Sequence, residues 1–126
     1  MIAQILVADD DAGVRSMIRD FLLSRHHRVL EASDGAQAFA MAEKEMPHLI
    51  IMDVVMAGLY GTTAAGRLRD YWRTSKIPVI LISGSTDARA LGIEEKPGLR
   101  FLRKPFKLEA LGEMIREMLP AGGYTP

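Results

Sequence analysis

The segment QILVADDD, residues 4–11, runs from aliphatic side chains directly into three consecutive aspartates. Two further aliphatic runs end in a similar way, since LIIM, residues 49–52, is followed by Asp53, and VILIS, residues 79–83, ends on a serine. Short apolar runs of this kind fit strands that are buried on both faces, as in a parallel sheet. We therefore interpret these segments as strands that carry polar groups at their carboxyl ends.

The rest of the chain alternates such runs with longer stretches of helical periodicity. Strands are expected at Gln4–Ala8, Arg28–Ala32, Leu49–Met52, Val79–Ser83 and Arg100–Leu102. Helices are expected around 14–22, from 35 to 45, from 62 to 75, at 86–91 and from 107 to 119. Five strands that alternate with five helices, beginning with a strand, indicate an α/β protein whose parallel sheet is covered on both faces.

Several local signals set the expected helix boundaries. Met46 should end the second helix, because a residue before proline is steered away from helical geometry. The fourth helix should be short or irregular, since Gly92 follows it and a proline and glycine lie shortly beyond. In the third helix we expect Ala65, Leu68 and Trp72 to face inward. Its arginines, Arg67, Arg69 and Arg73, are interpreted as a solvated face.

Bulk properties limit the kinds of protein that this chain can be. Its 126 residues suffice for one domain, which we expect over residues 1–120 with 121–126 as a tail or linker stub. Sixteen basic and sixteen acidic residues give no net charge that would favour nucleic acid or an anionic membrane. The absence of cysteine removes disulfides and thiolate chemistry, and no apolar run is long enough to span a membrane. A cytoplasmic protein is expected.

The polar residues at the strand ends form the expected functional site. In an open parallel sheet, ligands bind beyond the carboxyl ends of the strands. Asp9, Asp10, Asp53, Ser83 and Lys104 would meet there if the first, third, fourth and fifth strands are neighbours. Three clustered carboxylates repel one another unless a cation lies among them, and Mg²⁺ suits such an oxygen site. A carboxylate nucleophile, an ammonium and a hydroxyl beside Mg²⁺ meet the needs of phosphoryl transfer to aspartate.

Each of these residues also has a purely structural interpretation. Asp10 or Asp11 could cap the first helix, which for an aspartate in that position is about as common as a functional role. Ser83 could be a polar strand end, and Lys104-Pro105 a helix entrance. Because the polar residues fall at four strand ends together, the shared site is favoured. Asp53, which stands alone at the centre of the predicted sheet, is the best candidate for the nucleophile.

Four segments resemble the motif blocks of response-regulator receiver domains, and together they extend over nearly the whole chain. They are ILVADDD at 5–11, LIIMDVVM at 49–56 with Gly61 following, ILISG at 80–84 and FLRKPF at 101–106. The resemblance implies a single, doubly wound, five-stranded parallel sheet of flavodoxin-like fold, in the order 2-1-3-4-5. It also implies a domain that accepts a phosphoryl group and signals by changing conformation.

The resemblance implies a role for each residue of the site. Asp53 would be the phospho-acceptor. Asp10, Asp53 and the backbone carbonyl of Val55 would bind Mg²⁺ directly, and Asp9 would act mostly through a water. Lys104 would pair with the phosphoryl group, and the Lys104-Pro105 peptide would be cis.

A switch pair would report the phosphorylation. Ser83 would hydrogen-bond the phosphoryl group, and Phe101 would take the position of the aromatic switch residue. Two departures touch this face, because Ala57 replaces a common proline and Phe101 replaces the more usual tyrosine, which removes a hydroxyl.

The resemblance also implies the partners. The donor would be a sensor histidine kinase or a histidine phosphotransfer protein, and a downstream protein effector would receive the signal. No direct contact with nucleic acid or membrane is expected, and a homodimer is left open. The domain would be no enzyme beyond its own phosphoryl transfer and dephosphorylation.

Two other classes of protein could use a similar sheet. An aspartate-nucleophile phosphatase of the haloacid dehalogenase type would need a second aspartate two residues after the nucleophile, where this chain has Val55. A receiver-like interaction module that is never phosphorylated would not need the complete acceptor set.

Overall fold

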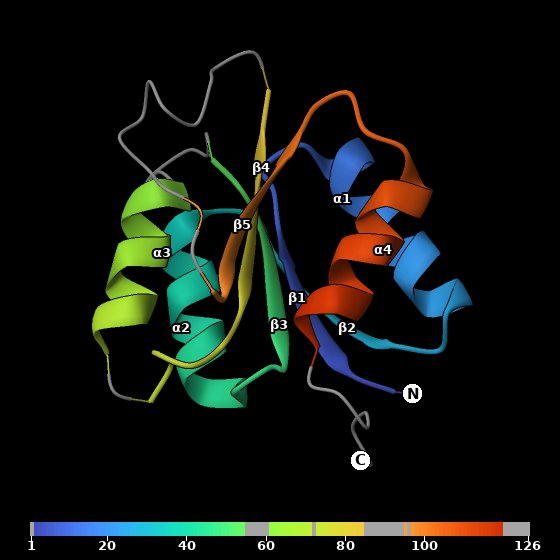
Figure 1. Cartoon of the computed structure of the whole chain (residues 1–126). Helices are drawn as coiled ribbons and strands as arrows, with labels where there is room; N and C mark the ends of the chain where they lie inside the picture. Colours follow the sequence, from blue (N-terminus) through green and yellow to red (C-terminus); the bar gives the residue numbers. More distant parts are fainter. Residues whose placement is uncertain (1, 55–60, 72, 85–94, 96, 120–126) are drawn as a thin grey trace.

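The computed structural model describes residues 2–54, 61–71, 73–84, 95 and 97–119 (Figure 1). The elements in chain order are β1 (Gln4–Ala8), α1 (Ala12–Ser24), β2 (Arg28–Ala32), α2 (Gly35–Glu45), β3 (Leu49–Asp53), α3 (Gly61–Asp70), β4 (Val79–Ser83), β5 (Leu99–Arg103) and α4 (Leu108–Met118). All five predicted strands are present, with β3 longer by one residue and β5 by one at each end. No helix in this described part is long and apolar enough to cross a membrane.

The strands form one parallel sheet in the order β2-β1-β3-β4-β5, as predicted. Helices α1 and α4 cover one face of the sheet, and α2 and α3 cover the other (Figure 1). The central strands β1, β3 and β4 are buried along almost their whole length. Strands of this kind are apolar on both faces, which explains the continuous aliphatic runs in the sequence.

Alternate residues of the central strands supply two separate cores. Leu6, Ile50 and Leu81 face α2 and α3, where Ala38, Ala42 and Leu68 pack against them. Ile5, Ile51 and Ile80 face the other side of the sheet. There they pack against the buried residues of α1 and α4, which are Ile18, Leu22, Leu111 and Ile115. Burial of both faces fixes the register of the sheet, because a shift by one residue would exchange the two sets.

The first two helices lie where the sequence predicts, and α1 extends two residues beyond the expected 14–22 at each end. Asp11 is the N-cap of α1, and its side chain accepts from the amides of Gly13 and Val14. Asp34 caps α2 in the same way. Helix α2 ends at Glu45, and its C-cap, Met46, takes a left-handed conformation with φ 50° immediately before the buried Pro47.

The third helix is shorter than predicted, since α3 ends at Asp70 rather than at 75. The buried Thr74 hydroxyl donates to the carbonyl of Leu68 at 2.6 Å, a bond that a helical amide would otherwise make. Leu68 faces inward as expected. The structure does not describe the side chains at positions 65 and 72, which were also predicted to face inward. The short helix predicted at 86–91 likewise lies outside the described residues.

Of the three arginines that the sequence places on a solvated face, Arg67 and Arg73 are exposed as expected, and Arg69 of α3 is half-buried. Arg73 donates to the carbonyl of Glu43. Arg69 donates to the carbonyls of Pro97 and Gly98, so it joins α3 to the residues that precede β5. Gly98 has φ +86°, and a side chain there would begin 2.9 Å from the Arg69 guanidinium. The left-handed backbone favours glycine at this position, and a Cβ there would also push the Arg69 guanidinium aside.

Two histidines hold the amino end of β1. The ring Nδ1 of His27 accepts from the amide of Ala3 at 3.2 Å, and Nδ1 of His48 accepts from the amide of Gln4 at 2.8 Å. Each ring must be neutral at Nδ1 to accept, so protonation breaks the bond. Burial lowers the pKa of both rings, and for His27 the charges of Arg25 and His26 lower it further.

We expect acid to weaken the fold through these rings. A histidine pKa below the unfolded value of 6.5 means that the folded state binds fewer protons, so stability is full above pH 6.5 and is lost as the pH falls through the folded pKa. His48→Asn should remove part of this dependence. Between about pH 7.5 and about pH 5.5, wild type should lose about 0.5–1 kcal/mol more unfolding free energy than the variant in urea titrations.

His26, the exposed residue that precedes His27, gives a matched control. His26→Asn suits the left-handed conformation of that residue, φ 69°, and removes a charge that lowers the pKa of His27, so it should change the pH dependence by less than His48→Asn does. Equal pH dependence in His48→Asn and wild type would contradict the role of the His48 ring.

Candidate metal centre

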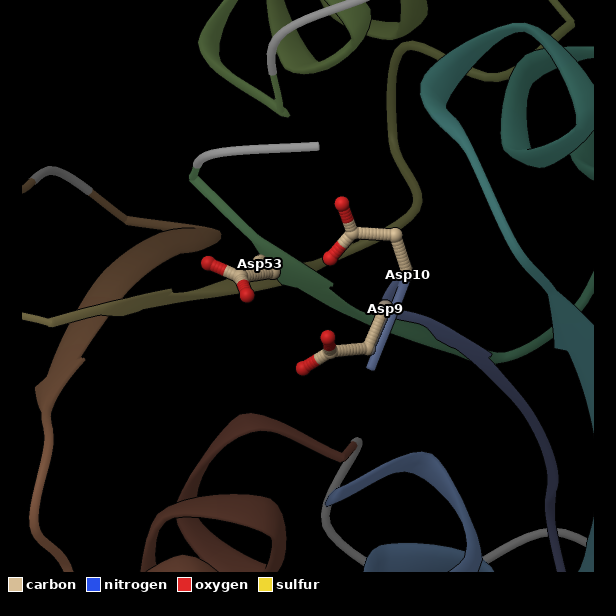
Figure 2. Close-up of side chains that lie close together, drawn as sticks. All are labelled: Asp9, Asp10 and Asp53. Carbon is tan, nitrogen blue, oxygen red and sulfur yellow. The ribbon is translucent and has the colours of Figure 1, made fainter. Parts of the chain in front are cut away.

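The strand ends bring three carboxylates together at one edge of the sheet. In the pairing of β1 with β3, Ala8 lies opposite Met52, so Asp9 and Asp53 follow at the same level. One carboxylate oxygen from each of Asp9, Asp10 and Asp53 lies within 4.8 Å of the other two. In the view of Figure 2, the Asp10 carboxylate points toward Asp53, and both carboxylates lie above that of Asp9. Clustered carboxylate oxygens at this spacing are ligands suited to a hard divalent cation.

An ammonium and a hydroxyl border the carboxylates. Lys104 directly follows β5, and its Nζ lies 3.1 Å from Oδ2 of Asp53 and 3.7 Å from Oδ2 of Asp9. Ser83 ends β4 next to Asp53 and is buried, and its carbonyl accepts from the amide of Lys104 at 2.6 Å. The Lys104-Pro105 peptide is cis, as the resemblance implies. The structure thus places Asp53, Ser83 and Lys104 at the carboxyl ends of three adjacent strands.

Burial makes Asp9 the electrostatically costly member of the cluster. It is 1% exposed, and its Oδ2 has no hydrogen-bond partner among the residues that the structure describes. Burial raises the pKa of Asp9 to about 6, and the charge of Asp53 adds to this rise. The hydrogen bond from the Asp11 amide and the charge of Lys104 act in the opposite direction. Burial opposes the charge of Lys104, but the hydrogen bond and charge of Asp53 raise the Lys104 pKa above its ordinary value.

We therefore expect Asp9→Asn to stabilise the metal-free protein. A pKa raised from 3.8 to about 6 corresponds to about 3 kcal/mol lost once the carboxyl is ionised, and the variant should recover about 1–3 kcal/mol. Because the folded-state pKa of Asp9 is raised, the stability gained by Asp9→Asn is full above about pH 6 and vanishes as the pH falls toward 3.8. Urea unfolding in the presence of a chelator measures it.

The control for this variant is Asp20→Asn, an exposed aspartate on α1 that should change stability little. An unfolding free energy of Asp9→Asn equal to or below that of wild type at neutral pH would contradict the cost assigned to the buried charge.

The helix cap is Asp11, which leaves the Asp10 carboxylate in the acidic cluster. Phe101 is half-buried on β5 opposite Leu81, where it packs against the core that faces α2 and α3. Val55 and Ala57 lie outside the described residues.

One contact at the site was not predicted from the sequence. Arg15 of α1 donates from Nη1 to the backbone carbonyl of Asp9 at 2.7 Å. An arginine on the expected solvent side of a helix carries no sequence signal for such a bond. The ion pair of Arg15 with Glu31 of β2 indicates that the arginine lies against the sheet, but predicting this pair requires the register of β2 on β1.

Comparison with known proteins gives a consistent family. Residues 5–116 match the model of the response regulator receiver domain. The response regulator PleD of Caulobacter vibrioides is 37% identical over 121 residues, which are 94% of this chain and 26% of PleD. The protein PilH of Pseudomonas aeruginosa is 33% identical over 118 residues, 93% of this chain and 98% of PilH. The chain therefore spans about a quarter of one relative and nearly all of the other.

Solved structures of receiver proteins have the same fold as this chain. The chemotaxis response regulator CheY4 of Vibrio cholerae has a TM-score of 0.81 and 26% identity, and the match covers 94% of this chain and all of CheY4. The receiver domain of a Pseudomonas aeruginosa sensor histidine kinase has a TM-score of 0.84 and 25% identity over 94% of this chain and 98% of that domain. That domain has a magnesium ion coordinated in its active-site cleft.

Proposed function

Since the chain belongs to the response regulator receiver domain family, which accepts phosphoryl groups in two-component signalling, we propose that Asp53 is the residue that is phosphorylated. One observation carries the proposal: the Asp53 carboxylate lies 3.1 Å from the Lys104 ammonium and within 4.8 Å of two further carboxylates. Asp53 is the central member, because β3 lies between β1 and β4.

In the proposed reaction, a carboxylate oxygen of Asp53 attacks phosphorus as the bond to the donor breaks. The Lys104 ammonium is placed to neutralise oxygens of the transferred group. The Ser83 hydroxyl would donate to one of those oxygens, and Phe101 would move with it as the switch. Signalling then requires that the phosphorylated protein favours the conformation in which these contacts form.

The cofactor of this proposal is Mg²⁺, held by Asp9, Asp10, Asp53 and the backbone carbonyl of Val55. The buried Asp9 carboxylate supports it, since an ionised oxygen without a hydrogen-bond donor is costly unless a cation offsets it. Bound Mg²⁺ would neutralise charge on the phosphoryl oxygens. Asp9 and Asp10 supply carboxylates from one side of the cluster, so Asp53 can keep one oxygen for the phosphoryl group.

The donor in this proposal is a sensor histidine kinase or a histidine phosphotransfer protein. A hollow beside Lys104 supports a protein donor, because Val14, Met17, Pro105 and Phe106 line it and Met17 is 43% exposed. We further propose a downstream protein effector, no nucleic-acid contact, a cytoplasmic location and a domain that extends over residues 1–120. The transfer and the later dephosphorylation would be catalysed only on the domain itself.

Acetyl phosphate with Mg²⁺, followed by intact-protein mass spectrometry, tests the proposal. A protein that gains the mass of one phosphoryl group supports it. Continuous release of phosphate without a modified protein would indicate a phosphatase instead. An unmodified protein and unconsumed acetyl phosphate would indicate a module that only binds partners.

A further inference from the structure

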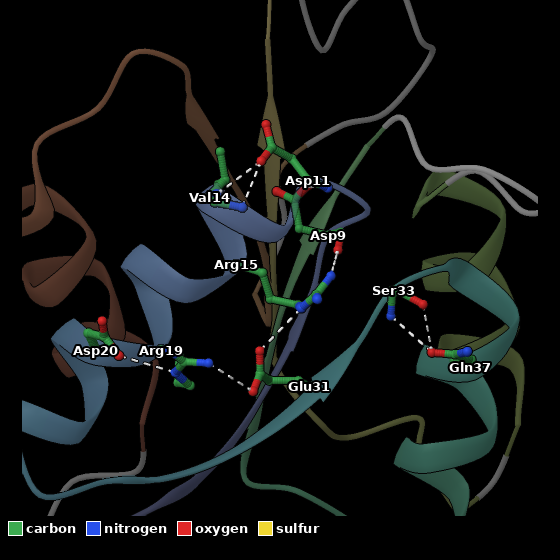
Figure 3. Close-up of polar contacts among 10 residues, drawn as sticks. Asp9, Asp11, Val14, Arg15, Arg19, Asp20, Glu31, Ser33 and Gln37 are labelled. Carbon is green, nitrogen blue, oxygen red and sulfur yellow. Dashed lines mark hydrogen bonds and ion pairs between the residues drawn. The ribbon is translucent and has the colours of Figure 1, made fainter.

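Arg15 joins three elements at the point where the acidic residues begin. Its side chain extends from α1 across the end of β1 (Figure 3). Nη1 donates to the carbonyl of Asp9 at 2.7 Å, and Nε donates to Oε1 of Glu31 at 3.1 Å. Glu31 lies on β2, opposite Val7 of β1. The side chain of Arg15 is 21% exposed, so water screens these bonds only in part.

The carbonyl that Arg15 holds belongs to the peptide that joins Asp9 to Asp10. Asp9 is fixed at two other points, because its amide donates to the carbonyl of Ala32 at 3.1 Å and its Oδ1 accepts from the amide of Asp11 at 2.9 Å. With the carbonyl held as well, this peptide cannot rotate without breaking a charge-assisted hydrogen bond. The peptide carries the backbone of Asp10, so its orientation bears on where the Asp10 carboxylate lies.

Glu31 removes the electrostatic disadvantage of an arginine at this place. A guanidinium close to a cation site would repel the cation, but Glu31 pairs with Arg15 and also accepts from Arg19 at 3.5 Å. The planar fork of arginine donates to Asp9 and Glu31 at once, which a single ammonium cannot do with the same geometry. The contact therefore adds orientation with little net charge.

We propose that Arg15 is a positioning residue for the metal ligands: by holding the Asp9 carbonyl, it sets the Asp10 carboxylate in the place where a divalent cation binds. The inference rests on the magnesium site of the proposed function. Partners that orient metal ligands from outside the coordination sphere commonly contribute about 10–100-fold to metal affinity.

The direction of the effect separates positioning from electrostatics. Removal of a positive charge near the cluster should tighten Mg²⁺ binding if charge alone matters, and salt should weaken that change. Loss of orientation should instead weaken Mg²⁺ binding, at low and high salt alike. A merely structural role would lower the unfolding temperature and leave the dissociation constant of the folded protein unchanged.

The experiment is a titration of the phosphate-free protein with Mg²⁺ alone, followed by calorimetry or by amide shifts, at a temperature where every variant is folded. Arg15→Gln should weaken binding about tenfold at both salt concentrations, and Arg15→Lys by less. Arg19→Gln is the matched control, because it removes the same charge from the same helix and from the same Glu31, but has no bond to Asp9. It should bind Mg²⁺ as wild type does or more tightly.

The outcomes distinguish this inference from the proposed function. If wild type binds Mg²⁺ and Asp10→Asn does not, but Arg15→Gln binds as wild type or more tightly, the positioning role is wrong and the metal site stands. If wild type does not bind Mg²⁺, or Asp10→Asn binds it equally, the metal site itself is wrong. Should Arg15→Gln not fold, Arg15→Lys decides the question, since affinity equal to that of wild type overturns the inference.

Discussion

Asp53→Asn should abolish phosphorylation by acetyl phosphate. The amide keeps the shape of the carboxylate but lacks its nucleophilic oxygen, and removal of a nucleophile commonly costs roughly 1,000-fold or more in rate. The variant should still fold, because it fits the same space at the end of β3 and can accept from Lys104 through its remaining oxygen. The measurement is intact-protein mass after incubation with Mg²⁺ and acetyl phosphate.

A control for this variant is available on the surface. Asp34→Asn makes the same chemical change at the N-cap of α2, where the amide oxygen can still accept from Gln37, and it should be phosphorylated as wild type is. Stoichiometric modification of Asp53→Asn, mapped to any other residue, would show that the acceptor lies elsewhere.

Asp10→Asn should remove Mg²⁺ binding and, with it, phosphorylation. Asp10 is the exposed carboxylate of the cluster, and the cap of α1 is formed by Asp11. Loss of one of few carboxylate ligands should reduce the affinity for Mg²⁺ by roughly tenfold or more. Titration with Mg²⁺ measures the affinity, and a chelator should reproduce the phosphorylation defect in wild type.

The adjacent residue is a close control for Asp10. Asp11→Asn removes the same charge one residue away, but its side chain accepts from the amides of Gly13 and Val14. An asparagine can keep that cap, so the variant should bind Mg²⁺ nearly as wild type does. Equal losses in Asp10→Asn and Asp11→Asn would mean that the site responds to total charge rather than to a particular ligand.

The strand ends were predictable because hydrophobic pattern and burial are tightly linked in a parallel sheet. Each aliphatic run must be buried on both faces, so the first polar residue after it marks the edge where a ligand binds. Asp9, Asp53 and Ser83 were found in this way, and the structure places all three there. The order of the strands came from the family resemblance, since periodicity alone does not decide which strands are neighbours.

Contacts between elements were not predictable. The end of α3 depends on the Thr74 hydroxyl, which reaches back to Leu68 after the chain has turned. The roles of Arg15 and Arg69 depend on carbonyls that the fold brings within reach, and one charged residue on a helix looks like another in sequence. The role of such an arginine can be assigned only when the position of the carbonyl that it binds is known.

The bond between Arg69 and Gly98 bears on how the edge of the sheet can move. The carbonyl of Gly98 accepts both from Arg69 of α3 and from the amide of Val79, where β4 begins. A slide of β5 along its own axis would stretch both bonds at once. The carboxyl end of β5 is held in its turn, by the amide of Lys104 on the carbonyl of Ser83 and by its ammonium on Asp53. The strand is therefore fixed to its neighbours at both ends, and at the amino end the link extends beyond the sheet to α3.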